Sequence, residues 1–277
     1  MSHFTVLVPA ESMEELKERL APYQENNMKD CPEEYLEFFD ITDEVESYFK
    51  EYKEKYPEDY CTLEQYAKDD GYEIKYDGDE VRCGYLENPN ARWDWWMPGG
   101  RWTGTLKLKA RELVAEAANG SSGLLTPPNE DPTRCDTAVV ADIDIDFHRN
   151  LARMEASELW KAWHDPSRPR MPVEGGDELE WNKWTFTNEG RSFFMLRNSE
   201  IDALNDMGLE EYANRYGEPR PITYAFIDLE GKWNERGKMG WWGMSDMEND
   251  AEYHVAFWKW IESLPVLTRL WVVDCHI

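Results

Sequence analysis

The chain has 277 residues and a net charge of −27, from 57 acidic and 30 basic side chains. Such a chain repels nucleic acid and anionic membranes at long range, which disfavours sequence-independent DNA binding. Its 41% hydrophobic and 14% aromatic content excludes wholesale disorder and allows a substantial core. The acidity has two interpretations: solvated faces that confer solubility, or an acidic face that docks on a basic partner such as a nucleic-acid-binding enzyme.

The sequence features that usually indicate a protein's cellular location favour the cytoplasm. No run approaches the roughly 18 apolar residues of a membrane span, and the start MSHFTVLVPAES lacks the charged and apolar regions of a signal peptide. The five cysteines are scattered and show no CxxC spacing, which suits free thiols in a reducing compartment better than disulfides or a zinc site. We therefore expect a cytoplasmic protein without membrane contact.

The N-terminal part predicts a strand, a helix and then an acidic layer. Residues 3–8 are rich in β-branched residues and predict the strand, and Ser12 with Glu15 fits a capping box at the start of the helix. From Glu11 to Glu80 the chain carries 24 acidic and 8 basic residues, and Val45, Phe49 and Tyr52 recur at helical spacing. We expect a helical, solvent-rich layer there, and a strand over 101–108.

Helices and strands alternate with loops in the middle of the chain. In chain order we expect a helix over 109–118, a loop over 121–132, a strand over 137–147 followed by a helix, a loop over 165–178 and a hairpin over 181–196. A strand over 222–228 comes next. Ser245 and Glu248 then fit the cap of a helix, and a strand over 270–275 ends the chain.

This order, βα at one end and βαβ at the other, predicts an α+β fold. We expect a ferredoxin-like sandwich whose two ends pair in one sheet, with a large, mostly helical insertion. It would be one elaborated domain over 1–277. Its parts are a core (1–26, 88–108 and 218–277), the acidic helical layer (27–87) and the inserted region (109–217).

Two runs combine tryptophan, glycine and cations. They are NPNARWDWWMPGGRWTG (88–104) and GKMGWWG (237–243). Indole faces stack on planar bases, arginine forks onto phosphate, and glycine lets backbone N–H groups approach an anion. The candidate ligand-binding residues are Arg92, Trp93, Trp95, Trp96, Arg101, Trp102, Arg236, Lys238, Trp241 and Trp242. Alternatively, the tryptophans seal a loop onto the sheet, with Arg101 paired to Asp94.

Asp142, Asp144, Asp146 and His148 share one face of the strand expected over 137–147. Three carboxylates on one side could hold Mg²⁺ or Mn²⁺ for phosphoryl chemistry. Apolar residues alternate on the other face, however, so an amphipathic edge strand with a solvated side explains the same pattern. We expect no resident metal and no cofactor.

Several stretches resemble a family of uncharacterised proteins from tailed phages and their bacterial hosts, especially actinobacteria. The matching residues are 4–10, 20–26, 88–102, 231–243 and 271–277, with the motifs NPxxxWDWxxxGGRW, GKMGWWG and a terminal DCHI. The acidic layer and the central loops fall outside the resemblance. It implies a phage or prophage setting, and hence the host cytoplasm, but no activity.

These observations lead to one main functional hypothesis and two alternatives. The first is a non-enzymatic protein that sequesters a nucleotide-derived host-defence signal, such as a cyclic oligonucleotide or an ADP-ribose derivative. No P-loop, GxGxxG, GxSxG or HExxH is present, and neighbouring residues of the DCHI strand point to opposite faces. The alternatives are an acidic inhibitor whose layer over 11–80 imitates nucleic acid to block a basic host enzyme, and a metal-dependent phosphodiesterase.

Overall fold

The computed structural model describes residues 2–59, 61–109, 133–167, 171–172, 181–182, 184–188, 191–193, 196–239 and 245–277. Within these ranges the protein is a mixed α+β structure, as the sequence predicts. The described α-helices are α1 (Met13–Leu20), α2 (Thr42–Lys55), α3 (Leu63–Asp69), α4 (Ile145–His164), α5 (Asn198–Asp206), α6 (Leu209–Tyr216) and α7 (Asp250–Ser263).

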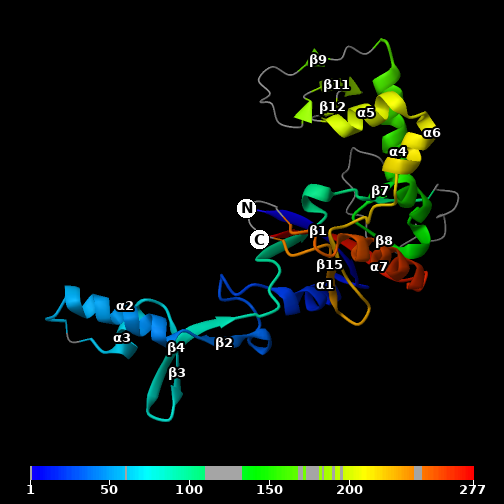
Figure 1. Ribbon diagram of the computed structural model, residues 1–277. Helices are drawn as coiled ribbons and strands as arrows, with labels where there is room; N and C mark the ends of the chain where they lie inside the picture. The colour runs from blue at the N-terminus through cyan, green and yellow to red at the C-terminus, as the bar shows by residue number, and fades with distance from the viewer. Residues whose placement is uncertain are drawn as a thin grey trace.

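The main sheet joins the two ends of the chain (Figure 1). Its strands are β1 (His3–Pro9), β5 (Trp95–Pro98), β8 (Thr137–Val139), β14 (Ala225–Ile227), β15 (Trp233–Glu235) and β16 (Arg269–His276). The order is β15-β14-β1-β16, and β5 and β8 both pair with the outer edge of β16. β1 is parallel to β14 and antiparallel to β16. Every residue of β16 is buried, as expected for a strand covered on both faces.

Helices cover opposite faces of this sheet. On β1, Phe4 and Val6 face a core that α1 completes, whereas Leu7 faces a second core that α7 completes. Successive residues of a strand point to opposite faces, so an unbroken apolar strand can serve two cores. The two ends of the chain pair in one sheet, as expected. A ferredoxin-like sandwich is not clearly shown, because α1 and α7 do not share a face.

Residues 27–87 form an arm that projects from the main sheet (Figure 1). Its strands β2 (Glu37–Asp40), β4 (Glu80–Glu87) and β3 (Glu73–Asp77) form a three-stranded antiparallel sheet in that order. α2 and α3 pack against the sheet around a small core of Val45, Ala67 and Cys83. The acidic layer is therefore part sheet as well as part helix. The sequence signal was the Asp-Gly turn between β3 and β4, where Gly78 has a φ of +64°.

A third group of elements contains α4, α5 and α6, which pack around a core that includes Trp163, Leu204 and Tyr212. The expected hairpin is present in the backbone: β11 (Trp184–Asn188) pairs antiparallel with β12 (Arg191–Phe193). The short strands β9 (Met171–Pro172), β10 (Trp181–Asn182) and β13 (Leu196–Arg197) lie in the same part of the chain.

Two local predictions are wrong. Instead of one strand over 101–108, the chain forms a 3-10 turn, η3 (Gly100–Trp102), and then the two-residue strand β6 (Leu106–Lys107), which pairs with β7 (Arg134–Cys135). α7 begins at Asp250 without a side-chain cap, five residues after Ser245, whose hydroxyl accepts hydrogen bonds from Tyr224 and the Met247 N–H. The helix expected over 109–118 lies almost wholly, and the loop over 121–132 entirely, outside the described residues.

Candidate functional site

The first tryptophan run does not form a single aromatic surface. Trp93 is 4% exposed and Trp96 is half-buried, and both pack in the core beneath α1. Trp102 packs against the opposite core, beneath α7. Trp95, by contrast, is 42% exposed. Because residues alternate along β5, Trp95 and Trp96 face opposite sides of the sheet. The alternative interpretation, in which the indoles pack, therefore holds for Trp93 and Trp96 and in part for Trp102.

An open hollow of about 550 Å³ lies at the end of the main sheet. It is found where the two ends of the chain meet, since β1 and β16 pair with His3 directly opposite His276. The hollow is lined by His3, Trp95, Met97, Gly100, Arg101, Asp274 and His276. Two of the predicted ligand-binding residues, Trp95 and Arg101, thus face the same space.

Each histidine of the hollow is hydrogen-bonded to a carboxylate. His3 Nδ1 lies 2.8 Å from Asp274 Oδ1, and His276 Nδ1 lies 2.6 Å from Asp94 Oδ1. A carboxylate only accepts hydrogen bonds, so each Nδ1 carries the proton and each Nε2 is an acceptor in the neutral ring. Both rings line the hollow, although their side chains are only 7% and 8% exposed. Neither Nε2 has a hydrogen-bond partner among the residues that the structure describes, and neither is fully buried.

Trp95 forms an aromatic wall with the two histidines. Its ring stacks on His276 with centroids 5.1 Å apart and planes 15° apart. His3 meets both rings edge-on, with centroids 5.2 Å from Trp95 and 4.8 Å from His276. One side of the indole is therefore occupied by His276, and its exposed part is available to a planar ligand.

Two glycines fit the backbone closely against carboxylates. Gly99 and Gly100 have φ values of +65° and +52°, and a Cβ at either position would overlap Asp136 or Asp274, respectively. The close approach lets the Arg101 backbone N–H donate to Asp274 Oδ2 at 3.0 Å. The Pro-Gly-Gly sequence therefore shapes the wall of the hollow.

Arg101 carries the free positive charge of the hollow. Its side chain is exposed and forms no ion pair with any residue that the structure describes. The predicted pair with Asp94 is wrong, because Asp94 is bonded to His276 and accepts nothing from Arg101. The guanidinium is consequently available to an anion.

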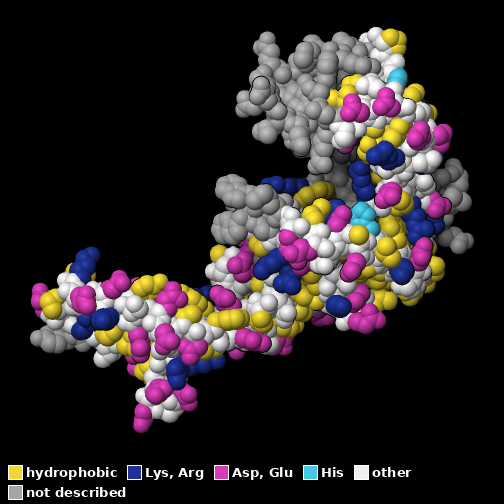
Figure 2. Space-filling view, viewed as in Figure 1, with side chains coloured by type: hydrophobic (Ala, Val, Ile, Leu, Met, Phe, Trp, Pro, Cys, Tyr) yellow, Lys and Arg dark blue, Asp and Glu magenta, His cyan; other side chains and the backbone are white. Residues whose placement is uncertain are grey.

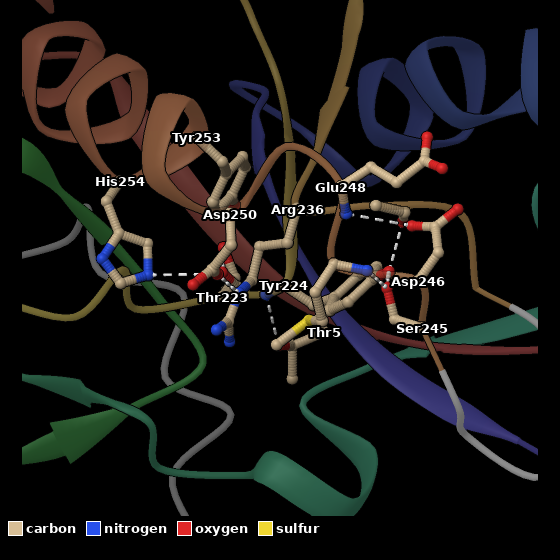
Figure 3. Close-up of polar contacts among 12 residues, drawn as sticks. Thr5, Thr223, Tyr224, Arg236, Ser245, Asp246, Glu248, Asp250, Tyr253 and His254 are labelled. Carbon is tan, nitrogen blue, oxygen red and sulfur yellow. Dashed lines mark hydrogen bonds and ion pairs between the residues drawn. The ribbon is translucent and has the colours of Figure 1, made fainter.

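Of the two cations at the second run, Arg236 is held by a carboxylate, whereas the ammonium of Lys238 is held by none that the structure describes (Figure 3). Arg236 Nε donates to Asp250 Oδ1 at 2.6 Å, and His254 Nε2 lies 3.4 Å from the same oxygen. The hydrogen bond from Arg236 lowers the pKa of Asp250 below its usual value. The side chain of Lys238 is exposed, and its backbone N–H donates to Asp246. Trp241 and Trp242 lie outside the described residues.

The two runs do not share one site in the described part of the chain. β5 and β15 lie at opposite ends of the sheet order, separated by four strand spacings or about 19 Å. Their link is Arg92, whose Nε lies 3.4 Å from Glu235 Oε1. The structure therefore brings together Trp95 and Arg101, but places Arg92, Arg236 and Lys238 elsewhere.

The proposed metal-binding strand is wrong. β8 ends at Val139, and Asp144 caps α4 by accepting the Phe147 N–H at 2.9 Å. Asp142 precedes the helix in a 3-10 turn and Asp146 lies in the first helical turn, so the three carboxylates share no face. A helix is favoured over a strand here because an aspartate at the N-cap accepts hydrogen bonds from the free N–H groups of the first helical turn. Within the described ranges, no group of three or more His, Cys, Asp or Glu residues could hold a metal ion.

Sequence reasoning missed His3, Asp274 and His276 as site residues. It compared only adjacent residues of the terminal DCHI motif and found them on opposite faces. The useful signal was the spacing of two, which places Asp274 and His276 on the same face of β16. That His3 joins them depends on the pairing of β1 with β16, which no local pattern reveals.

A second hollow, of about 510 Å³, lies at the base of the arm. Its charged lining consists of Glu25, Glu33, Glu73 and Glu87, with Lys29 as the one cation. Four carboxylates against one ammonium disfavour an anionic ligand there. The hollow that Arg101 lines is therefore the better candidate for a phosphate-bearing molecule.

The chain matches no protein-family model, and neither the curated proteins nor the solved structures include a match. Among the described helices, none has the length and apolar character to cross a bilayer.

Proposed function

We propose that the protein binds a small nucleotide-derived molecule in the hollow lined by Trp95 and Arg101. The observation that carries this proposal is their placement: an exposed indole and an unpaired guanidinium face one space. An indole stacks on any base, and a guanidinium forks onto phosphate. Together they suit a ligand that carries a planar base and an anionic group.

Donor chemistry and size also support a nucleotide-like ligand. Asp94 and Asp274 each accept a hydrogen bond from a histidine and neither is paired with the Arg101 side chain, whose guanidinium remains available to a phosphate. The volume of about 550 Å³ lies within the range of small-molecule sites, about 300–1,000 Å³. Cyclic oligonucleotides and ADP-ribose derivatives combine bases with phosphate and fit this chemistry. In a phage or prophage setting, sequestering such a molecule would silence a host-defence signal.

Binding is tested by equilibrium titration of the untagged protein with cyclic di- and trinucleotides, cyclic ADP-ribose isomers and NAD. Loss of one stacked base costs about 1–3 kcal/mol, so Trp95→Ala should weaken binding about 5- to 150-fold. Arg101→Gln should also weaken it. Arg220→Gln is the matched control, because Arg220 is 65% exposed and paired with Glu155 away from the hollow. If Trp95→Ala and Arg101→Gln bind as tightly as this control, the ligand does not occupy the hollow.

The arm supports a second candidate function, docking on a basic protein. Residues 27–87 hold 20 acidic and 7 basic side chains, a net charge of −13. Figure 2 shows acidic and hydrophobic side chains spread over the projecting arm. Exposed aromatic residues accompany the charge, with Tyr76 62% and Tyr85 41% exposed. An acidic surface of this kind fits a partner that normally binds nucleic acid.

This candidate is tested by capture of host proteins on the immobilised full-length chain. A nucleic-acid-binding protein should be retained at low salt and released at moderate salt, because salt screens exposed charge pairs. The triple variant Asp77→Asn, Asp79→Asn and Glu80→Gln should retain less of it. Capture that is insensitive both to salt and to this variant would exclude an electrostatic role for the arm.

A further inference from the structure

The two histidines of the hollow are arranged in a way that binding alone does not require. Each ring is held through Nδ1 by a separate carboxylate, both rings line the same hollow, and neither Nε2 has a hydrogen-bond partner among the described residues. The ring centroids are only 4.8 Å apart. A general acid or base must come within hydrogen-bonding reach of its proton, about 2.6–3.2 Å between heavy atoms. Rings this close can reach two oxygens on one phosphorus.

We infer that the hollow also cleaves its ligand, by metal-free hydrolysis of a phosphodiester bond in a cyclic oligonucleotide, with His3 and His276 as general base and general acid. The inference rests on the proposed function, because the ligand must first occupy the hollow. It differs from sequestration in its outcome, since the bound molecule is opened instead of being retained intact.

The step needs water as its single co-reactant. A neutral imidazole accepts a proton at Nε2 from a water molecule as the water oxygen forms a bond to phosphorus. The bond from phosphorus to the leaving sugar oxygen breaks, and that oxygen takes the Nε2 proton of the other, protonated ring. The ring of the ligand opens to a phosphate monoester and a hydroxyl, and the two histidines exchange protonation states. No electron transfer takes place, and one water molecule is consumed.

The remaining groups of the hollow suit this reaction. Asp274 and Asp94 orient the rings and stabilise the imidazolium, as carboxylates do for catalytic histidines elsewhere. They act through His3 and His276 and are positioning residues. Arg101 can stabilise the negative charge that develops on the phosphoryl oxygens, and Trp95 can stack on a base of the ligand.

The experiment is incubation of the untagged protein, with EDTA present, with cyclic di-AMP, cyclic di-GMP and cyclic GMP-AMP. Chromatography and mass spectrometry of the heat-released material detect the linear product, which gains the mass of one water. We expect turnover that EDTA does not abolish. His3→Asn and His276→Asn should lower the rate about 100- to 10,000-fold and leave affinity within a few-fold.

His164→Gln is the matched control. His164 stacks on Trp160 at 3.8 Å, much as His276 stacks on Trp95, but it lies on α4. Its turnover should equal that of the wild type. Asp94→Asn and Asp274→Asn provide variants in which both rings remain. Each should shift the pH dependence of the rate, a readout that a purely structural role would not move.

The groups that set this pH dependence are the two histidines, Asp94, Asp274, Arg101 and, near Asp94, Glu25. We expect a bell-shaped rate profile, because one ring must be neutral and the other protonated.

The outcomes separate the two proposals. Tight binding with release of intact ligand overturns the hydrolysis and leaves the binding function standing. Absence of both binding and turnover overturns both. Turnover that EDTA abolishes, or that persists in His3→Asn and His276→Asn, shows that another group performs the chemistry.

Discussion

Gly100→Ala tests whether the wall of the hollow is built as the structure indicates. Gly100 has a φ of +52°, and a Cβ there would overlap the Asp274 carboxylate. The carboxylate would have to move, and its hydrogen bonds from the Arg101 N–H and from His3 would be lost. Gly231→Ala is the control for the backbone alone, because Gly231 has a φ of +86° and open space around it.

The expected magnitudes follow from these geometries. A non-glycine residue in the left-handed region costs about 1–2 kcal/mol, and both variants incur that cost. A hydrogen bond to a charged group contributes about 1.5–3 kcal/mol, and only Gly100→Ala loses such bonds, from the Arg101 N–H and from His3. Gly100→Ala should therefore lower the free energy of unfolding by about 3–6 kcal/mol more than Gly231→Ala does.

The assay is urea unfolding followed by tryptophan fluorescence and circular dichroism, with ligand titration of the folded variants at low denaturant. Gly100→Ala should also weaken binding or turnover, whereas Gly231→Ala should not, since its turn lies between β14 and β15. Equal destabilisation by the two substitutions would refute the close packing of Gly100 against Asp274.

Three further predictions concern buried groups. Burial lowers the pKa of His148 to about 4, so its neutral ring stabilises the fold above the ordinary value of 6.5, and that stability is lost as pH falls from 6.5 towards 4. The loss should approach about 3 kcal/mol in urea unfolding, and His148→Gln should flatten this slope. Burial raises the pKa of Asp136. Its contribution to the free energy of unfolding is therefore full below the ordinary aspartate pKa, and it is lost as the pH rises through the raised value. Asp136→Asn should remove that decline in the same pH series, and an unchanged slope would contradict the assignment. Cys275 is fully buried with a strongly raised pKa, whereas Cys61 is half-exposed, so a thiol reagent should label Cys61 first and Cys275 only on unfolding, as mass spectrometry would show.

Part of the candidate site was readable from the sequence. The density of indoles and cations over 88–104 identified Trp95 and Arg101, both of which line the hollow. The same density also selected Trp93, which is buried, because composition does not distinguish an indole that packs from one that is exposed. Strand alternation separates Trp95 from Trp96, but only once β5 is known to be a strand with one exposed face and one that packs on the core.

The aspartates near residue 144 show the limit of periodicity. Alternating polar and apolar residues predict a strand, but the same short sequence is also compatible with a helix that has an aspartate at its N-cap. Tertiary contacts decided between them. His148 accepts the Lys107 N–H at 3.0 Å from the buried side of α4, which a strand continuing from β8 would not allow.

The sequence by itself determined the α+β class, the strands at both ends of the chain and the helices α1 and α7, because these depend on local hydrophobic periodicity and turn residues. It also determined the acidic character of residues 27–87. Only the tertiary structure decided that α1 and α7 cover opposite faces and that the acidic segment projects as an arm. It alone brought His3 to His276, residues 273 positions apart in sequence, because strand pairing is a long-range choice that depends on which apolar faces can be buried together.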